Sequence, residues 1–154
     1  MWYCDDKVPF PASKIAARAR SEWVPRDDHW QGEGTILLID DEQSVLTITS
    51  KMLEMMGFAV LTAGDGREAL RVFRERQDDI VCVLLDLTMP SMDGGEVFRE
   101  LRCILPDVRV IMTSGYVEQD VAQRFVGKGL AGFLQKPFLY DTLLARLREV
   151  LENT

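Results

Sequence analysis

The chain has 154 residues, 47% of them hydrophobic and 28% charged, and a formal net charge of −7. This length allows one domain with a substantial core and a modest extension, and the composition is typical of a soluble globular protein. The acidic balance argues against direct nucleic-acid binding, which needs a basic face. No apolar run approaches the roughly 18 to 20 residues that cross a bilayer, and the N-terminus lacks a signal-peptide pattern. The three cysteines form no CxxC pair, so we expect a reduced, cytoplasmic protein without membrane insertion.

Residues 1–33 differ from the rest of the chain. They hold three prolines, all three tryptophans and the single histidine, His29, but no strand pattern. A short helix is predicted over Ser13–Trp23, with Ser13 as its N-cap. We expect residues 1–33 to form an N-terminal extension or linker, in which His29 is a solvated side chain.

From Gly34 onward, strand and helix patterns alternate five times. Strands are predicted at Ile36–Ile39, Ala59–Thr62, Ile80–Leu85, Val108–Met112 and Gly132–Leu134. Helices are predicted at Glu42–Met56, Arg67–Arg76, Gly94–Ile104, Glu118–Gly127 and Tyr140–Leu151. The first and third strands are nearly continuous apolar runs, as expected when helices cover both faces of a sheet. The alternation therefore predicts a parallel α/β fold with right-handed crossovers.

The first predicted helix has an apolar pattern close to that of a single buried face. The residues that define this face are Val45, Ile48, Met52, Leu53, Met55 and Met56. The helix is expected to stop at Gly57, because glycine suits the left-handed conformation of a C-terminal cap.

Polar residues follow four of the predicted strands. Asp40 and Asp41 come after the first strand, Asp86 after the third, Ser114 after the fourth and Lys136 after the fifth. The carboxyl ends of parallel strands share one edge of the sheet, where such folds bind ligands. Three acids, a hydroxyl and a lysine at one edge suit a divalent cation and a phosphoryl group. The pattern therefore indicates phosphate chemistry on an aspartate.

The acidic residues offer the ligands that Mg²⁺ prefers. Asp41, Asp86 and the backbone carbonyl oxygen of Thr88 can bind the ion directly, and Asp40 can hold a metal-bound water. Without metal, three neighbouring carboxylates repel one another, so at least one pKa should rise. With the metal, Asp86 stays ionised and can attack a phosphoryl group.

The lysine and the hydroxyl complete the constellation. Lys136 would balance charge on a transferring phosphoryl group, and the Ser114 hydroxyl can donate to one of its oxygens. Each residue alone also has a structural interpretation: Asp40 or Asp41 could cap the following helix, and Lys136 could be a surface lysine. The occurrence of all of them in order at strand ends favours the functional interpretation.

Four short motifs in order resemble the receiver domain of two-component response regulators. They are "LLIDDE", "VLLDLTMPSMDGGE", "VIMTSGY" and "FLQKPF", and the resemblance covers about residues 34–154. It implies a flavodoxin-like, doubly wound sheet of five parallel strands in the order 2-1-3-4-5, with five helices. The segment before Asp40 is also similar to the junction that precedes the C-terminal receiver of hybrid sensor histidine kinases.

The resemblance assigns a role to each site residue. It implies the following: Asp86 is the phosphoacceptor, Asp40 and Asp41 are the acidic pair, Ser114 is the switch hydroxyl, Lys136 is the phosphate-pairing lysine and Phe133 is the aromatic switch position. Because residue 133 is Phe and not Tyr, such a switch would lack a phenol hydrogen bond. The family also usually has a cis peptide bond at the position of Lys136-Pro137.

These observations favour a phosphorylatable switch. A histidine kinase or phosphotransfer protein would supply the phosphoryl group, and Asp86 would accept it with Mg²⁺ present. The only catalysis expected is self-phosphorylation from a phosphodonor and self-dephosphorylation, with Thr88 and Tyr116 flanking the site. Two alternatives are a receiver-like binding module that is not phosphorylated and an aspartate-nucleophile phosphatase. The phosphatase is disfavoured, because Thr88 stands where such enzymes carry a second acid. A monomer or weak dimer is expected, with an unknown downstream protein partner.

Overall fold

The computed structural model describes residues 30–115, 118–125 and 127–152. The predicted helix at Ser13–Trp23, His29 and Tyr116 lie outside these residues. The folded unit begins at Gly32, whose backbone N–H donates to the carbonyl oxygen of Met56 at 2.8 Å. Across the described ranges, no helix has both the length and the apolar character needed to cross a membrane.

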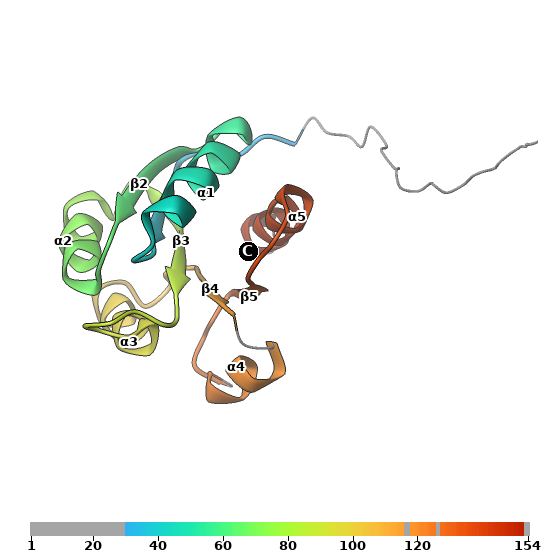
Figure 1. Cartoon of the computed structure of the whole chain (residues 1–154). Helices are drawn as coiled ribbons and strands as arrows, with labels where there is room; N and C mark the ends of the chain where they lie inside the picture. The colour runs from blue at the N-terminus through green and yellow to red at the C-terminus, as the bar shows by residue number, and fades with distance from the viewer. Residues whose placement is uncertain (1–29, 116–117, 126, 153–154) are drawn as a thin grey trace, which may run out of the picture. The chain divides into compact units, whose positions relative to one another are not determined.

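The described residues form one sheet of five parallel strands in the order β2-β1-β3-β4-β5 (Figure 1). The strands are β1 (Thr35–Ile39), β2 (Ala59–Ala63), β3 (Ile80–Asp86), β4 (Val110–Ser114) and β5 (Gly132–Gln135). The predicted doubly wound α/β fold and its strand order are confirmed. The direction of winding reverses between β1 and β3, and open α/β sheets bind ligands at such a switch point.

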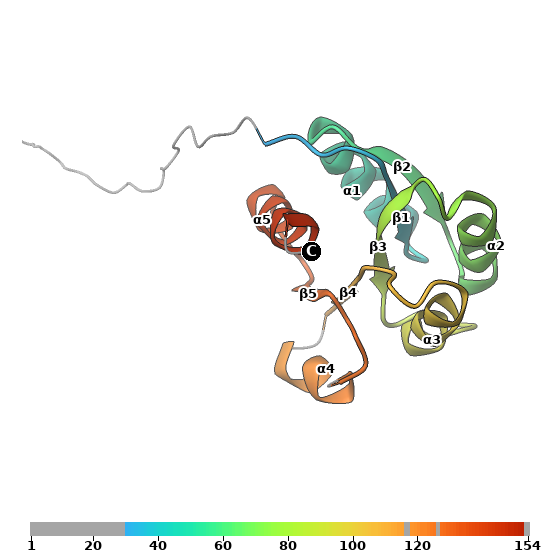
Figure 2. The ribbon, with the colours of Figure 1, turned by 180° about the vertical axis from the view of Figure 1, so that it is seen from behind.

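Helices cover both faces of this sheet. They are α1 (Gln43–Met55), α2 (Gly66–Arg76), α3 (Gly94–Ile104), α4 (Glu118–Arg124) and α5 (Tyr140–Glu152). Figures 1 and 2 show α1 and α5 on one face and α2, α3 and α4 on the other. Phe73, Phe98 and Phe125 belong to the apolar cluster that packs α2, α3 and α4 against the sheet. The strands β1 and β3 are buried between the two layers, which explains their unbroken apolar runs.

The predicted apolar face of α1 is wrong in part. Leu46, Thr49 and Leu53 are the buried residues of this helix, whereas Ile48 and Met55 are 56% and 74% exposed. Ile48 and Met55 are seven residues apart and share a second stripe that faces away from the sheet. Helix α1 therefore has two apolar stripes and not one, and helical spacing alone does not tell which stripe meets the core.

Two predicted elements also have ends that differ from the observed ones by two residues or more. The strand predicted at Val108–Met112 is observed as β4 at Val110–Ser114, because the Val108 N–H donates to the Leu105 carbonyl oxygen within a turn. The helix predicted to reach Gly127 ends at Arg124. Gly127 has a φ of +74°, which a right-handed helix does not allow.

Aspartate caps position the helices that begin near the sheet edge. The Asp65 side chain accepts a hydrogen bond from the Glu68 backbone N–H at 2.8 Å and caps α2. Asp93 and Glu96 form a capping box at the start of α3, with bonds of 3.0 and 3.2 Å. Gly57 has a φ of 104° after α1, so its predicted capping conformation is confirmed.

Candidate functional site

Asp86 lies at the carboxyl end of β3, beside Thr113 of β4. The residue is only 4% exposed. Its Oδ1 accepts a hydrogen bond from the Thr88 backbone N–H at 3.3 Å, and the Thr88 side chain is exposed. The Asp86 carboxylate is therefore buried at the carboxyl edge of the sheet.

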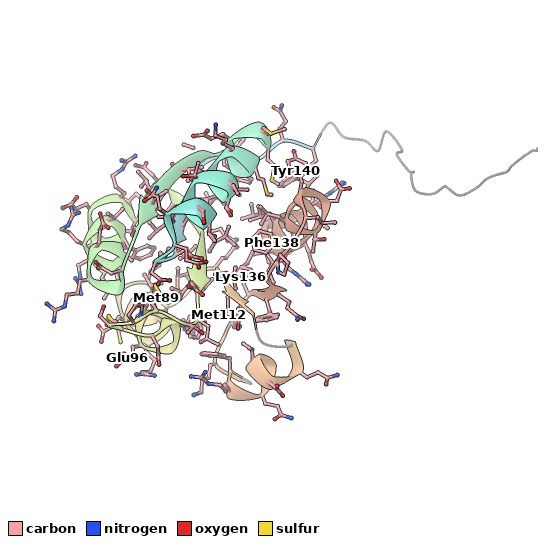
Figure 3. The ribbon with its side chains drawn as sticks, in the orientation of Figure 1. Met89, Glu96, Met112, Lys136, Phe138 and Tyr140 are labelled. Atoms are coloured by element: carbon pink, nitrogen blue, oxygen red, sulfur yellow. The ribbon has the colours of Figure 1, made fainter. Side chains whose placement is uncertain are left out.

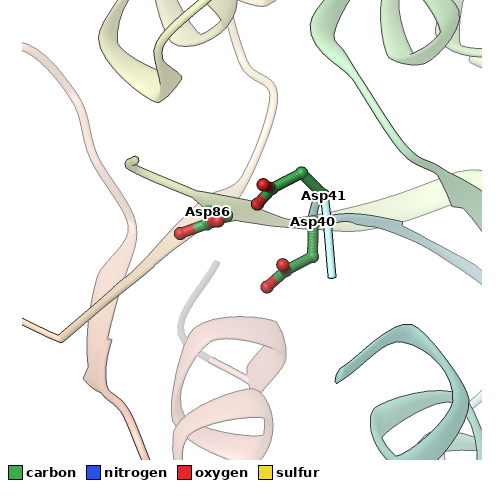
Figure 4. A group of neighbouring side chains, drawn as sticks. All are labelled: Asp40, Asp41 and Asp86. Atoms are coloured by element: carbon green, nitrogen blue, oxygen red, sulfur yellow. The ribbon is translucent and has the colours of Figure 1, made fainter. Parts of the chain in front are cut away.

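The three aspartates predicted to share a site do come together. Carboxylate oxygens of Asp40, Asp41 and Asp86 all lie within 4.8 Å of one another (Figure 4). Asp40 and Asp86 are buried and Asp41 is exposed. The capping alternative does not describe Asp40, because the N-cap of α1 is Glu42. Instead, Asp40 Oδ1 accepts a bond from the Glu42 backbone N–H at 2.9 Å.

Lys136 reaches this cluster from the end of β5. Its Nζ lies 2.7 Å from Asp40 Oδ2 and 3.3 Å from Asp86 Oδ1. The side chain is 21% exposed, so the two ion pairs are largely shielded from water and stronger than surface pairs. The Lys136-Pro137 peptide bond is cis, as the resemblance implied. Figure 3 labels Lys136 at the sheet edge.

Burial raises the pKa of the Asp86 carboxyl from 3.8 to about 6. The Lys136 charge opposes this rise, and the neighbouring Asp40 carboxylate adds to it. For Lys136, burial acts to lower the pKa, but the hydrogen bond with Asp40 and the charges of Asp86 and Asp40 raise it. The predicted rise at one carboxyl is therefore correct in direction. Loss of water, more than mutual repulsion, is its largest cause.

Ser114 ends β4 and is 1% exposed. Its carbonyl oxygen accepts a 2.7 Å hydrogen bond from the Lys136 backbone N–H, which ties together the exits of β4 and β5. The neighbouring Thr113 hydroxyl makes a long 3.5 Å contact with the Leu85 carbonyl oxygen. The Thr113 hydroxyl is thus directed at the neighbouring strand β3.

Phe133 on β5 is 5% exposed and belongs to the hydrophobic core. Successive side chains of a strand point to opposite faces. Gly132 faces Arg146 and Val150 of α5, so Phe133 points to the other face, where it joins the cluster that contains Phe125. Phe133, the predicted aromatic switch position, thus lies on the face of the sheet that packs against Phe125 and α4.

The start of α3 packs directly against the backbone of Asp86 and Leu87. The Gly94 N–H donates to the Leu87 carbonyl oxygen at 2.8 Å. A Cβ atom on Gly94 would lie 2.5 Å from the Asp86 carbonyl oxygen and 2.6 Å from Leu87 Cα. Glycine at this position is therefore a requirement of close approach between α3 and the end of β3.

Gly94→Ala is expected to destabilise the fold by about 1–3 kcal/mol, because backbone atoms cannot move aside as a flexible side chain can. Gly115→Ala is the matched control, since a Cβ atom there meets nothing within 4 Å. Urea denaturation measures both variants. Equal stability of the two variants would contradict the close packing of α3 on Asp86.

Sequence comparison places this fold and site in a family. The profile of the response regulator receiver domain matches residues 36–148. The chain therefore belongs to the receiver domains of two-component systems, which are signalling domains.

Several known proteins are similar to this chain in sequence or in structure. The chain is 35% identical over 142 residues to the sensor kinase CckA of Brucella abortus, covering 92% of this chain and 15% of that protein. A response regulator receiver domain from Clostridium thermocellum superposes with a TM-score of 0.72 at 33% identity, covering 77% of this chain and 94% of that one. A chain of the CheX-CheY-BeF3-Mg²⁺ complex from Borrelia burgdorferi superposes with a TM-score of 0.72 at 29% identity, covering 76% of this chain and 88% of that one. The chain spans about half the length of several other curated relatives.

Two features of the site were not predicted from the sequence. One is the direct pairing of Lys136 with Asp40, which joins residues 96 positions apart. The other is a groove beside Lys136, with a volume of about 350 Å³. It is lined mainly by Val45, Ile48, Met52, Lys136, Pro137 and Phe138. The apolar spacing of Ile48 and Met55 is visible in the sequence, but it predicts burial in the core, whereas both side chains are exposed.

Proposed function

We propose that this receiver accepts a phosphoryl group on Asp86 from the phosphohistidine of a histidine kinase or phosphotransfer protein. The observation that carries the proposal is the buried Asp86 carboxylate, with Lys136 Nζ 3.3 Å away and two further carboxylates within 4.8 Å. The Asp86 carboxylate thus lies between the Lys136 ammonium group and two carboxylates that can hold a metal ion. Phosphoryl transfer to a carboxylate needs such positive charge beside the nucleophile.

The residues fit a magnesium ion. Three converging carboxylates form a hard, anionic oxygen donor set, the type that binds Mg²⁺. Asp41, Asp86 and the backbone carbonyl oxygen of Thr88 would hold the ion, with Asp40 holding a metal-bound water. When bound, Mg²⁺ supplies positive charge that neutralises the phosphoryl oxygens. The Borrelia burgdorferi complex, which contains BeF3 and Mg²⁺, supports this choice of ion.

The chain's own residues perform the transfer. A carboxylate oxygen of Asp86 forms a bond to phosphorus, the phosphorus–nitrogen bond of the phosphohistidine breaks, and the imidazole nitrogen keeps that electron pair. Lys136 then turns from Asp40 towards the phosphoryl oxygens, and the Ser114 hydroxyl donates to one of them. The added charge, roughly −1.5 to −2, and the three acceptor oxygens favour this second arrangement. Water later attacks the phosphorus of the acyl phosphate beside the exposed Thr88. The bond between phosphorus and the Asp86 oxygen breaks, inorganic phosphate leaves and the Asp86 carboxylate is restored.

The phosphorylated arrangement changes the interaction surface. Ser114 ends β4 and Lys136 follows β5, so their movement alters the surface formed by β4, α4 and β5, with Phe133 packed beneath it. A downstream protein partner reads this altered surface. Phosphorylation in this account shifts a two-state equilibrium that the fold already contains.

We assign residues 34–154 to the receiver and residues 1–33 to a linker or extension. The 142-residue match to CckA is longer than the receiver and includes part of residues 1–33, which supports the receiver of a hybrid kinase as the origin of this chain. Free thiols at Cys82 and Cys103 support a cytoplasmic location. The receiver acts as a monomer or a weak dimer.

Incubation with acetyl phosphate and Mg²⁺, followed by intact-mass measurement, tests the proposal. The expected result is a gain of one phosphoryl mass that EDTA prevents. A protein that gains no mass with acetyl phosphate or with a phosphorylated histidine kinase would be a receiver-like binding module. Continuous release of phosphate from small phosphate monoesters would instead indicate a phosphatase.

The groove beside Lys136 is suited to the phosphodonor protein. Lys136 lines the groove and also contacts Asp86, so a protein that presents phosphohistidine to Asp86 approaches over this surface. Figure 3 labels Lys136 and Phe138, which both line the groove from the segment after β5. The exposed side chain of Ile48 offers an apolar contact for a helix that carries the histidine.

Ile48→Asp is expected to slow phosphotransfer from a phosphorylated histidine kinase by about tenfold or more, because a charge replaces an apolar contact in a desolvated interface. Labelling by acetyl phosphate should not change, since that small donor needs no groove. Met55→Asp is the matched control: Met55 is 74% exposed on the same helix and does not line the groove. Equal rates for the two variants with the kinase would argue against docking at the groove.

A further inference from the structure

The position of α4 depends on few side chains. This helix has seven residues, and so short a helix is marginal without tertiary contacts. Among the described side chains of α4 and the residue after it, Val121 and Phe125 are buried, with exposures of 2% and 7%. Both belong to the apolar cluster that also contains Phe133. These anchors therefore determine where α4 rests on the sheet.

Phe125 is held against α3. Its ring meets the Phe98 ring edge to face, with centroids 5.7 Å apart and an interplanar angle of 81°. Such edge-to-face pairs stabilise a contact beyond the area that they bury. The Arg124 guanidinium carbon lies over the Phe125 ring, 5.5 Å from its centroid. A Cβ atom on Gly95 would lie 3.7 Å from Phe125 Cζ, so the first turn of α3 also approaches this ring closely.

Each of the two rings belongs to a segment that is connected to a different residue of the site. Phe98 is on α3, and the start of α3 is packed on the backbone of Asp86 through Gly94. Phe125 follows α4, which comes after β4 and its last residue, Ser114. A displacement of α4 relative to α3 would therefore break or repack the Phe98–Phe125 contact.

We propose that the Phe98–Phe125 contact is a latch that stabilises the unphosphorylated position of α4. The proposal rests on the proposed function, because it concerns the response to a phosphoryl group on Asp86. Phosphorylation weakens the latch through Ser114, and Phe133, in the same apolar cluster, transmits the change to Phe125 by packing. The seam between α3 and α4 is then a surface that differs between the two states.

Weakening the latch should favour the activated state. Binding and conformational equilibria are reciprocal, so a destabilised resting state binds a phosphoryl mimic more tightly. The probe is beryllofluoride with Mg²⁺, titrated while NMR follows the backbone amides of β4. Phe98→Leu and Phe125→Leu are each expected to raise the apparent affinity about 2- to 10-fold, as expected for loss of one aromatic pair. The double variant should gain no more than either single variant, because both remove the same contact.

Phe73→Leu is the matched control. Phe73 is fully buried on α2, so this variant loses a ring of equal size from the core but not from the latch, and no gain in affinity is expected. General damage to the fold lowers affinity for the mimic, whereas the latch requires a gain. A Phe125→Leu variant that binds beryllofluoride no more tightly than the wild type would overturn the latch.

The same titration separates this proposal from the proposed function. A wild-type protein that does not bind beryllofluoride and Mg²⁺, or an Asp86→Asn variant that binds as tightly as the wild type, would refute phosphorylation at Asp86 itself. Wild-type binding that depends on Asp86, together with unchanged affinity in both latch variants, would refute only the latch.

Discussion

Asp86→Asn is expected to abolish the Mg²⁺-dependent phosphoryl mass gain from acetyl phosphate. The amide of asparagine is not a nucleophile towards phosphorus, and it removes one of the three negative charges that would hold the metal. Lys136 would still pair with Asp40, whose carboxylate is 2.7 Å away, so the architecture of the site should survive the change. Intact-mass measurement after incubation with acetyl phosphate provides the readout.

Asp65→Asn is the matched control for this loss. Asp65 is an exposed aspartate that caps α2, and asparagine is an equally good N-cap. This variant should gain the phosphoryl group as the wild type does. If Asp86→Asn were still labelled at the wild-type rate, peptide mapping would place the acceptor on another residue and the assignment of Asp86 would be wrong.

The same Asp86→Asn substitution is expected to stabilise the metal-free protein at pH 7, by roughly 2 kcal/mol. Burial raises the pKa of Asp86 to about 6 from 3.8, which means that the folded state favours the protonated carboxyl. At pH 7 the wild type must keep a buried charge that the variant lacks. Chemical denaturation of both proteins in EDTA measures the difference.

The difference in stability between the wild type and Asp86→Asn is expected to grow as pH rises. Below about pH 4 the Asp86 carboxyl is protonated in the folded and the unfolded state, so the pH-dependent advantage of the variant is absent. Between about pH 4 and pH 6 the unfolded chain loses the proton first, and the wild type loses stability relative to the variant as pH rises. Above about pH 6 the difference is constant. A difference that stays flat, or that shrinks as pH rises, would contradict the raised pKa.

Magnesium should reverse the order of stability. A ligand that binds the folded state stabilises it in proportion to the logarithm of its concentration over its dissociation constant. Asp86 is a proposed ligand, so added Mg²⁺ should stabilise the wild type more than Asp86→Asn. The charge that destabilises the empty site is thus the same charge that makes the site useful for metal and phosphoryl binding.

Most of the fold was predictable because its signals are local. The apolar runs of β1 and β3 and the glycine that ends α1 each act within a few residues. The boundary of β4 was less predictable, because a turn at Val108 competes with the strand for the same apolar residues. The buried stripe of α1 was misassigned, because helical spacing gives the periodicity of apolar residues but not the direction of the core.

The residue pattern alone predicts the order of strands and helices along the chain, and it predicts that Asp40, Asp41, Asp86, Ser114 and Lys136 lie at strand ends. A general rule for parallel sheets then brings those ends to one edge. Three features follow from the folded arrangement alone: the pairing of Lys136 with Asp40, the identity of Asp86 as the carboxyl with the raised pKa, and the contact of Phe98 with Phe125. These features depend on distances of a few ångströms and on exclusion of water between segments far apart in the chain, and no local pattern encodes either quantity.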